Sequence, residues 1–273
     1  MQSKNLSYIL FLDINGTLTN NLLPISQPVK LAISSINNDL RIVLITGRSL
    51  SSTILIADEL DLSCYAITEG GARIIDDQKR TILLSCIVEK TAKKVVSLCT
   101  KLNIEFNICI EGKSYLYPDE KIFTPQNFSR ISRICVLNIN KSYLKNLENY
   151  LQKIEDVDFF QVKNNKNPTN WNLDITAKNV NKKTSLKKLL KLEKFSNSKT
   201  IGIGDGYNDI EFIKNVEIKI AMGNAVDELK QIADYTVDTV INDGIVDAIN
   251  IVKRLLKSFK YGKQNFRGGD CPY

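Results

Sequence analysis

The sequence predicts an α/β protein in which a mainly parallel sheet with flanking helices carries an inserted α+β domain. Apolar runs such as SYILFLD and RIVLIT alternate with helical segments near the start of the chain, and a similar alternation returns near its end. Between these parts, strands and helices follow one another in a different rhythm. A length of 273 residues is sufficient for a core domain with a smaller inserted domain.

The first part of the predicted core alternates strands and helices. Residues 7–13 form an apolar run that ends in Asp and is followed by a turn-forming Asn-Gly pair, which is typical of a buried parallel strand opening into a loop. A helix at about 28–38, a strand at 41–46 and a helix at about 50–59 follow. Residues 64–75 predict a third strand, a glycine turn and the start of a hairpin.

The inserted block has its own alternation of elements. We expect helices at about 89–102 and 141–153, and strands near 106–110, 114–117, 133–138, 157–162 and 171–175. The polar segment 162–170 is expected to form a loop of this block. An independent alternation placed between two parts of a parallel sheet predicts a lid domain.

The core pattern then returns. A helix at 182–193, a strand at 200–205, a helix after Tyr207, a short strand at 216–222 and a closing helix at about 244–257 are expected. The resulting division is a core of residues 1–81 and 177–258, an inserted domain of residues 82–176, and a polar, poorly ordered tail of residues 259–273.

Composition restricts the class of protein. Hydrophobic residues make up 43% of the chain and charged residues 25%, the balance of an ordinary globular protein. No apolar run reaches the roughly 20 residues that a membrane span needs, and the N-terminus lacks a signal-peptide pattern, so we expect a cytoplasmic protein with no membrane partner. The net charge of +7 comes with lysines spread over helical faces, which favours a solvated surface over a nucleic-acid partner.

Two residue types restrict the chemistry. The chain contains no histidine, which excludes serine–histidine triads, histidine general bases and histidine-ligated metals. The six cysteines include no CxxC pair, so reduced structural thiols are favoured over disulfides or a zinc site. Catalysis therefore depends on carboxylates, lysines, hydroxyls, backbone amides and a hard metal ion.

Four segments place polar residues at the expected carboxyl edge of the sheet, where ligands bind in open α/β folds. They are Asp13–Thr17, Thr46–Arg48, Lys182 and Gly204–Asp209. A single Asp at the end of a strand is more often a turn or capping residue than a catalytic one. The order and spacing of the four segments together indicate a functional site.

In this order and spacing, the four segments resemble the motifs of haloacid dehalogenase-like phosphatases. The resemblance extends from about residue 7 to 258 and includes the segments ITEGGARI, DITAKNVNKKTSL and IAMGNAVDELKQIADYTV. The position of the inserted block is similar to that in the Cof-type branch, which has a type IIB cap and includes many sugar-phosphate phosphatases. The resemblance implies a Rossmann-like parallel-sheet core with an inserted α+β cap that selects the substrate.

The resemblance implies a nucleophile and a metal site. Asp13 is the expected nucleophile, whose attack on phosphorus forms an aspartyl-phosphate. Mg²⁺ is the expected cofactor because it prefers oxygen ligands and offsets the charge of two anions that must meet. Its expected ligands are Asp13, the backbone carbonyl of Asn15, and Asp205, with Asp209 nearby in an orienting or outer-shell position.

The remaining motif residues are expected to bind the phosphoryl group. Lys182 supplies an ammonium between nucleophile and phosphoryl oxygens, and register with the family motif favours it over Lys183. The Thr46 hydroxyl, the Gly47 amide and Asn208 are the other expected phosphate ligands. The predicted catalytic set is Asp13, Asn15, Thr46 and Lys182.

Asn15 departs from the family pattern. The residue two positions after the nucleophile is normally a second aspartate, which protonates the leaving oxygen and later activates water. An amide does not exchange a proton near neutral pH. Since general acid–base catalysis is typically worth about 10²–10⁴-fold, activity can survive this change, with the greatest loss on simple alkyl phosphates and the least on acyl or anomeric phosphates.

Three functions follow as alternatives. The first is a slow or selective phosphatase acting on a small phosphorylated metabolite, such as a sugar phosphate or a similar phosphomonoester. The second is a non-catalytic protein that binds a phosphorylated ligand or has a regulatory function. The third is a phosphotransferase or mutase that forms the same aspartyl-phosphate. The retention of Asp13 with the other motif residues favours an enzyme.

The inserted block offers polar and aromatic candidates for substrate contact. They are Lys113, Tyr115, Tyr117, Lys121, Arg130 and Trp171. Each is individually more typical of packing or of a solvated surface than of a binding site. The segment Trp171–Asp174 lies where the chain is expected to re-enter the core, and it is the part of the block of greatest interest.

Overall fold

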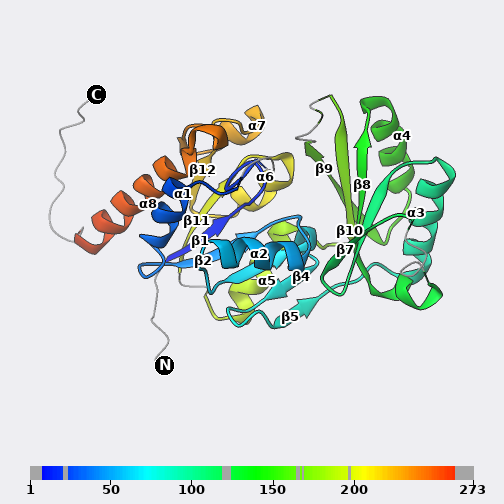
Figure 1. The fold of residues 1–273 in the computed structure, drawn as a ribbon, viewed down its shortest axis with the longest axis horizontal. Coiled ribbons are helices and arrows are strands. Elements are labelled where there is room, and N and C mark those ends of the chain that lie inside the picture. Colours follow the sequence, from blue (N-terminus) through cyan, green and yellow to red (C-terminus); the bar gives the residue numbers. More distant parts are fainter. Residues whose placement is uncertain are drawn as a thin grey trace.

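The computed structural model describes residues 8–20, 24–118, 124–163, 167, 169–195 and 198–261. Two sheets organise this part of the chain (Figure 1). One has eight strands in the order β13-β12-β11-β1-β2-β3-β4-β5, and the other has five in the order β7-β6-β8-β10-β9. The predicted α/β class with a parallel-sheet core is confirmed.

Most strands of the eight-stranded sheet run parallel. The strands that pair in parallel are β1 (Tyr8–Leu12), β2 (Arg41–Ile45), β3 (Tyr65–Thr68), β11 (Lys199–Gly204), β12 (Ile218–Ala221) and β13 (Tyr235–Thr236). β4 (Arg73–Ile75) pairs antiparallel with both β3 and β5 (Thr81–Leu84). β1 lies between β2 and β11, so the chain order reverses beside it. Such a reversal is where ligands bind in open α/β sheets.

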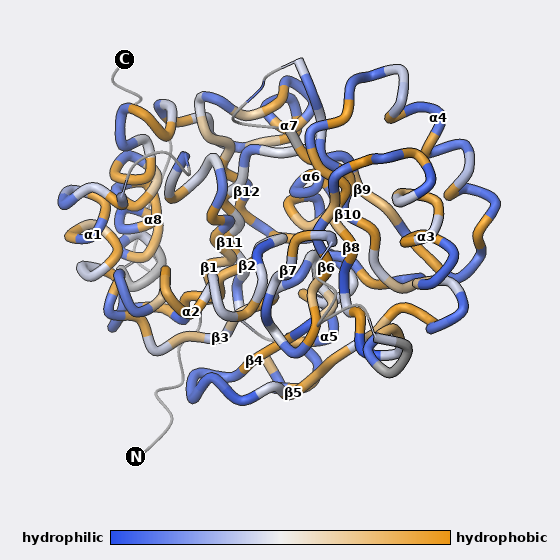
Figure 2. Tube along the Cα trace, turned by 45° about the vertical axis from the view of Figure 1, so that its right-hand side comes forward, coloured by the Kyte–Doolittle hydropathy of each residue, from blue (hydrophilic) through white to orange (hydrophobic). Residues whose placement is uncertain are grey.

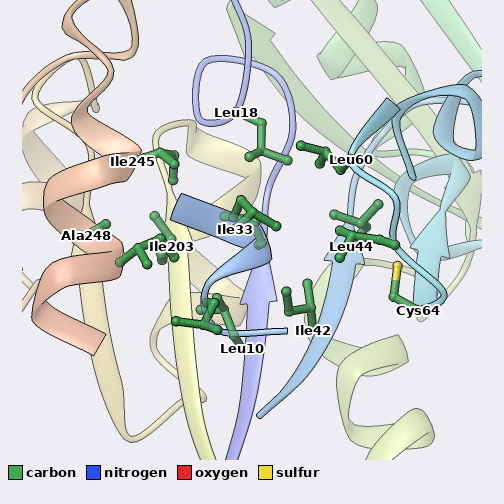
Figure 3. Packing of buried hydrophobic residues seen from close by; sticks show 14 of the residues in the cluster. Leu10, Leu18, Ile33, Ile42, Leu44, Leu60, Cys64, Ile203, Ile245 and Ala248 are labelled. Atoms are coloured by element: carbon green, nitrogen blue, oxygen red, sulfur yellow. The ribbon is translucent and has the colours of Figure 1, made fainter. Parts of the chain in front are cut away.

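Helices cover both faces of this sheet. α1 (Gln27–Ser34), α2 (Leu50–Glu59) and α8 (Gly244–Tyr261) lie on one face, and α5 (Lys182–Leu192), α6 (Tyr207–Ile213) and the short α7 (Asp227–Lys230) on the other. Successive strand side chains point to opposite faces. Leu10 therefore lies on the first face, in one cluster with Ile33 of α1 and Ala248 of α8 (Figure 3), while Ile9 and Phe11 pack on the second.

The five-stranded sheet has its own hydrophobic cluster. It consists of β6 (Phe106–Ile110), β7 (Lys113–Leu116), β8 (Ile131–Ile139), β9 (Val157–Lys163) and β10 (Trp171–Ala177), with antiparallel pairing between neighbours. α3 (Glu89–Lys101) and α4 (Lys141–Leu151) pack on the face turned away from the core (Figure 1). Figure 2 shows hydrophobic residues concentrated along the strands and hydrophilic ones along the outer turns. We call this unit the cap.

The free face of the cap sheet is turned to the core, where several contacts join the two. Ser51 N–H at the start of α2 donates to the Gly112 carbonyl of the β6–β7 turn at 2.9 Å. The rings of Trp171 on β10 and Tyr207 on α6 lie 5.7 Å apart between centroids. Ser132 on β8 donates to the buried carboxylate of Glu69 in the loop after β3.

The elements follow the sequence expectations closely, with additions. The expected strand at 216–222 is shorter, and β5, α7 and β13 were not predicted. β5 includes residues 82–84 and pairs with β4 in the core sheet; the domain division at 81, 176 and 258 stays a prediction. α8 extends to Tyr261, so residues 259–261 of the tail that was predicted to be poorly ordered are helical.

Parts of the predicted loop and tail lie outside the described residues. These are 164–166 and 168 in the loop and 262–273 in the tail. Within the part of the chain that the structure describes, no helix is long and apolar enough to cross a membrane.

Candidate active site

The predicted nucleophile lies at the end of β1, in the centre of the sheet. Asp13 is buried, and its backbone N–H donates to the Ile203 carbonyl of β11 at 3.1 Å. The loop then turns sharply through Gly16, whose φ of +83° favours glycine. A Cβ at this position would stand 2.1 Å from Oδ2 of Asp205. Gly16 therefore allows the loop after β1 to contact the loop after β11.

Lys182 joins two of the carboxylates. Its Nζ lies 2.6 Å from Oδ1 of Asp13 and 2.6 Å from Oδ1 of Asp209, and all three side chains are buried. Lys182 is the first residue of α5, a helix capped by the Asn181 side chain, which accepts from Thr184 N–H at 2.9 Å. Lys183 instead points to the surface, where it pairs with Glu211 at 2.9 Å.

Asp209 is held firmly in place. Its Oδ2 accepts hydrogen bonds from the backbone N–H groups of Asp205, at 3.0 Å, and Gly206, at 2.9 Å, while its Oδ1 accepts from Lys182. Both oxygens are thus engaged by donors of the chain. The geometry agrees with an orienting position for Asp209.

Asp205 is tied to the loop after β1 by two side chains. Thr17 Oγ1 lies 3.3 Å from its Oδ1, and Asn224 Nδ2 lies 3.2 Å from its Oδ2. Asn224 also donates to the Gly16 carbonyl at 2.8 Å and accepts from Val240 N–H at 2.8 Å. Asn224 was missed as a site residue, although its Gly-Asn-Ala turn belongs to a segment that resembles the family.

The cluster carries more negative than positive charge. Carboxylate oxygens of Asp13, Asp205 and Asp209 lie within 4.8 Å of one another. Burial and the nearby Asp209 raise the pKa of Asp13 to about 7, although Lys182 opposes the shift. Burial, Asp13 and Asp209 raise the pKa of Asp205 well above its usual range. Burial alone would lower the pKa of Lys182, but Asp13 and Asp209 raise it.

This arrangement fits a hard divalent cation. Its donors are carboxylate oxygens, which Mg²⁺ prefers, and a cation would offset the charge that raises their pKa values. Asp13 and Asp205 are the residues best placed to hold it, since both oxygens of Asp209 already accept hydrogen bonds.

The loop after β2 has all three of its carbonyl groups engaged. The Thr46 carbonyl accepts from Gly70 N–H at 3.1 Å, and the Arg48 carbonyl accepts from Glu69 N–H at 2.8 Å. The Gly47 carbonyl accepts from Nη1 of Arg133 in the cap. The loop is therefore fixed from the side of β3 and the cap.

The same loop presents donors. Arg48 N–H donates to Thr46 Oγ1 at 3.1 Å, so the hydroxyl accepts there and keeps its own proton to donate. Among the described residues, the Gly47 N–H has no hydrogen-bond partner. A hydroxyl and a backbone amide of this kind suit phosphoryl oxygens.

Asn15 contacts this loop through its side chain. Nε of Arg48 donates to Oδ1 of Asn15 at 2.7 Å, and Nη1 of Arg48 lies 3.4 Å from Oγ of Ser52. Asn208 is placed differently from the other expected ligands, because its Oδ1 lies 2.5 Å from where a Cβ of Gly206 would stand. Its side-chain amide thus folds over the turn that starts α6.

A buried charge pair of the cap lies against the loop after β2. Arg133 on β8 and Asp174 on β10 are 3.3 Å apart, and a Cβ on Gly47 would stand 2.9 Å from Oδ2 of Asp174. Nη2 of Arg133 lies 3.4 Å from Oδ1 of Asn107. Arg133 was missed by sequence reasoning because it stands inside a strand, whereas Asp174 is the last residue of the segment Trp171–Asp174 that was singled out from the sequence.

The proposed substrate contacts of the cap are mostly engaged in packing or surface pairing. Tyr117 stacks on Phe106 with 4.6 Å between ring centroids, and Tyr115 packs against the cap cluster. Arg130 pairs with Glu111 at the surface, and Lys113 is exposed. Trp171 faces Tyr207 of the core. Lys121 lies outside the described residues.

Comparison with protein families agrees with this geometry. Residues 10–249 match the family model of haloacid dehalogenase-like hydrolases. The chain belongs to this family. The match includes both sheets and the loops that carry Asp13, Lys182 and Asp205, so the resemblance inferred from the four motifs is confirmed.

Individual relatives of this hydrolase cover nearly the same length. A 5-amino-6-(5-phospho-D-ribitylamino)uracil phosphatase of Bacillus subtilis is 28% identical over 244 residues, which cover 88% of this chain and 94% of the relative. A phosphoglycolate phosphatase of Methanobrevibacter smithii is 26% identical, covering 87% and 94%. The solved structure of BT4131, a subclass IIB sugar phosphatase, shares the fold with a TM-score of 0.72 at 23% identity, covering 90% and 98%.

Proposed function

We propose that this chain is a Mg²⁺-dependent phosphatase that hydrolyses a small phosphorylated metabolite through an aspartyl-phosphate on Asp13. The observation that carries the proposal is the buried cluster in which Lys182 lies 2.6 Å from both Asp13 and Asp209. A nucleophile, a fixed ammonium and an oxygen-rich cation site meet there at the reversal of strand order beside β1.

The chain's own groups account for the first step. The Asp13 carboxylate attacks phosphorus, the new O–P bond forms, and the bond to the leaving oxygen breaks with its electron pair on that oxygen. Lys182, the Thr46 hydroxyl and the Gly47 amide hold the phosphoryl oxygens. Mg²⁺ bound by Asp13, Asp205 and the Asn15 carbonyl would neutralise charge on the phosphoryl group. Water then releases phosphate and regenerates Asp13.

A sugar phosphate or a similar phosphomonoester is the proposed substrate. Support comes from the substrates in the names of the relatives, which are a phosphoribitylamino-uracil, phosphoglycolate and a sugar phosphate. The position of the cap also supports a small substrate, because Arg133 of its sheet reaches the Gly47 carbonyl beside the expected phosphate ligands.

A phosphotransferase is the second candidate, and Asn15 is the observation that favours it. Without a carboxylate two residues after Asp13, water is activated less well, so the aspartyl-phosphate persists longer and can pass its phosphoryl group to another acceptor. Asn15→Asp should raise hydrolysis of alkyl phosphates by about 10²-fold if water activation limits the rate. An unchanged rate would show that water activation does not limit hydrolysis, and would remove the support that Asn15 gives to the phosphotransferase.

The test of the main proposal is phosphate release by the purified full chain. Acetyl phosphate, p-nitrophenyl phosphate and a panel of sugar phosphates are assayed with Mg²⁺ and with chelator. We expect turnover that needs Mg²⁺ and falls by about 10⁴-fold or more in Asp13→Asn. The control is Asp77→Asn, which changes an exposed carboxylate. Turnover that survives Asp13→Asn would refute the assignment of the nucleophile.

A further inference from the structure

The side-chain amide of Asn15 has an orientation that chemistry fixes. Arg48 Nε lies 2.7 Å from it, and a guanidinium has only donors, so the amide atom that faces Arg48 is the oxygen. The two N–H groups of Nδ2 are consequently directed away from Arg48. Within the described residues they have no hydrogen-bond partner. The loop of the nucleophile thus carries a pre-oriented pair of donors.

Arg48 is well placed to maintain that orientation. Its backbone is fixed on both sides, by the bond from its N–H to Thr46 Oγ1 and by the bond from Glu69 N–H to its carbonyl. Its guanidinium also reaches Ser52 at 3.4 Å. Burial lowers the pKa of Arg48 while the charge of Asp13 raises it, which agrees with a cation held near the nucleophile.

We propose that Asn15 donates a hydrogen bond from Nδ2 to the leaving oxygen, and that Arg48 is the residue that positions this amide. The inference rests on the proposed phosphatase function. As Asp13 forms its bond to phosphorus, the leaving oxygen takes the electron pair of the broken bond. The Asn15 N–H stabilises that negative charge without transferring a proton, and the oxygen is protonated by solvent after it departs.

This mode of stabilisation selects a class of substrate. A donor that keeps its proton leaves the full charge on the departing oxygen, so the rate depends steeply on the basicity of the leaving group. Acyl phosphates and sugar phosphates esterified at the anomeric carbon release weakly basic oxygens. Phosphates of primary alcohols release strongly basic ones. The inference therefore assigns the first class as preferred substrates.

The test is a leaving-group series. Acetyl phosphate and phenyl phosphates whose phenols differ in acidity are assayed with Mg²⁺, for wild type, Asn15→Ala, Arg48→Met and the double variant. We expect Asn15→Ala to reduce kcat/KM about 10- to 100-fold for the most basic phenol and little for acetyl phosphate. Arg48→Met should steepen the dependence in the same way, mainly through kcat.

The double variant separates positioning from general structural damage. If Arg48 acts through Asn15, Arg48→Met adds little to Asn15→Ala. Arg80→Met, at an arginine whose side chain is 69% exposed, is the matched control. Equal losses on every substrate, or fully additive effects, would overturn the inference while leaving the phosphatase proposal standing. A wild type that hydrolyses none of the series and forms no phosphoenzyme would overturn both.

Discussion

The catalytic cluster and the contact between cap and core both bury opposite charges, but the charged groups differ in how completely they are hydrogen-bonded. In the cluster, Lys182 lies 2.6 Å from each of two carboxylates, and both oxygens of Asp209 accept hydrogen bonds. At the cap contact, Arg133 and Asp174 are 3.3 Å apart, and within the described part of the chain Nε of Arg133 and Oδ1 of Asp174 are buried without a hydrogen-bond partner. A buried polar atom without such a partner costs about 1–3 kcal/mol.

The difference suits a catalytic cluster of fixed geometry and a weaker contact between cap and core. A cluster in which every carboxylate accepts a hydrogen bond holds its geometry through the reaction, as electrostatic stabilisation of a phosphoryl group requires. On opening, the two unpaired atoms of the cap pair would be hydrated again, which offsets part of the free energy needed to separate cap and core. The Arg133–Asp174 pair therefore stabilises the closed arrangement less than a fully hydrogen-bonded pair would.

Replacement of the central lysine is the strongest way to break the catalytic cluster. Lys182→Met leaves buried carboxylates without a countercharge, so in chelator the free energy of unfolding should fall by about 3–5 kcal/mol. Phosphate release should fall by about 10³-fold, since the variant loses a charge that contacts the phosphoryl oxygens. Denaturant unfolding and the phosphate assay measure these changes.

Lys183→Met is the matched control for this variant, because Lys183 pairs with Glu211 at the surface. Its effect on unfolding should stay below about 1 kcal/mol. Similar losses in the two variants would contradict the role assigned to the buried ammonium.

Replacement of the cap pair tests whether that contact is weaker. Arg133→Met leaves Asp174 buried without its partner and should lower the free energy of unfolding by about 3 kcal/mol. The double variant Arg133→Met, Asp174→Leu should recover most of this loss, because apolar side chains replace a poorly paired ion pair. Denaturant unfolding of the full chain compares them. A double variant as unstable as the single one would mean that the pair itself stabilises the closed cap.

The smallest expected effect concerns pH and Mg²⁺. The pKa of Asp13 is raised to about 7 from 3.8, so between these values the folded chain binds a proton that the unfolded chain lacks. In chelator, stability should therefore fall as pH rises from 5 to 8, by about 2–3 kcal/mol. Since Mg²⁺ competes with that proton, its stabilising effect should be larger at pH 8 than at pH 5.

Thermal and denaturant unfolding at four pH values, with chelator and with Mg²⁺, measures this dependence. Asp13→Asn removes one of two titrating groups and should make the curve in chelator less steep, while Asp205, whose pKa is also raised, still contributes. A wild-type curve in chelator as flat as that of the variant would show that Asp13 is not the group responsible.

The strands and motif residues that depend on local sequence pattern could be predicted from the sequence. Apolar runs that end in polar loops located β1, β2 and β11, and the order of motifs placed Asp13 and Asp205 at the same edge of the sheet. Register with the family motif favoured Lys182 over Lys183, and the structure places Lys182 beside Asp13. β5 was missed because the short segment TILL has neither clear alternation nor flanking turn signals on both sides.

Contacts between distant segments were not accessible to that reasoning. Arg48 meets Asn15 from 33 positions away, and Arg133 meets Gly47 from 86 positions away. Nothing in the local pattern of a strand such as ISRICVLNI distinguishes an arginine that reaches the core from one that faces solvent. Side-chain direction at the cap contact depends on how two sheets pack, which a single sequence does not specify.

The chain contains one tryptophan, and its position gives the cap a natural spectroscopic probe. Trp171 belongs to the cap, whereas Tyr207, 5.7 Å away, starts the core helix that follows Asp205. Separation of the two units would move the indole from this aromatic contact into water. Intrinsic fluorescence would therefore report opening of the cap in the unlabelled protein, without an engineered dye or an added cysteine.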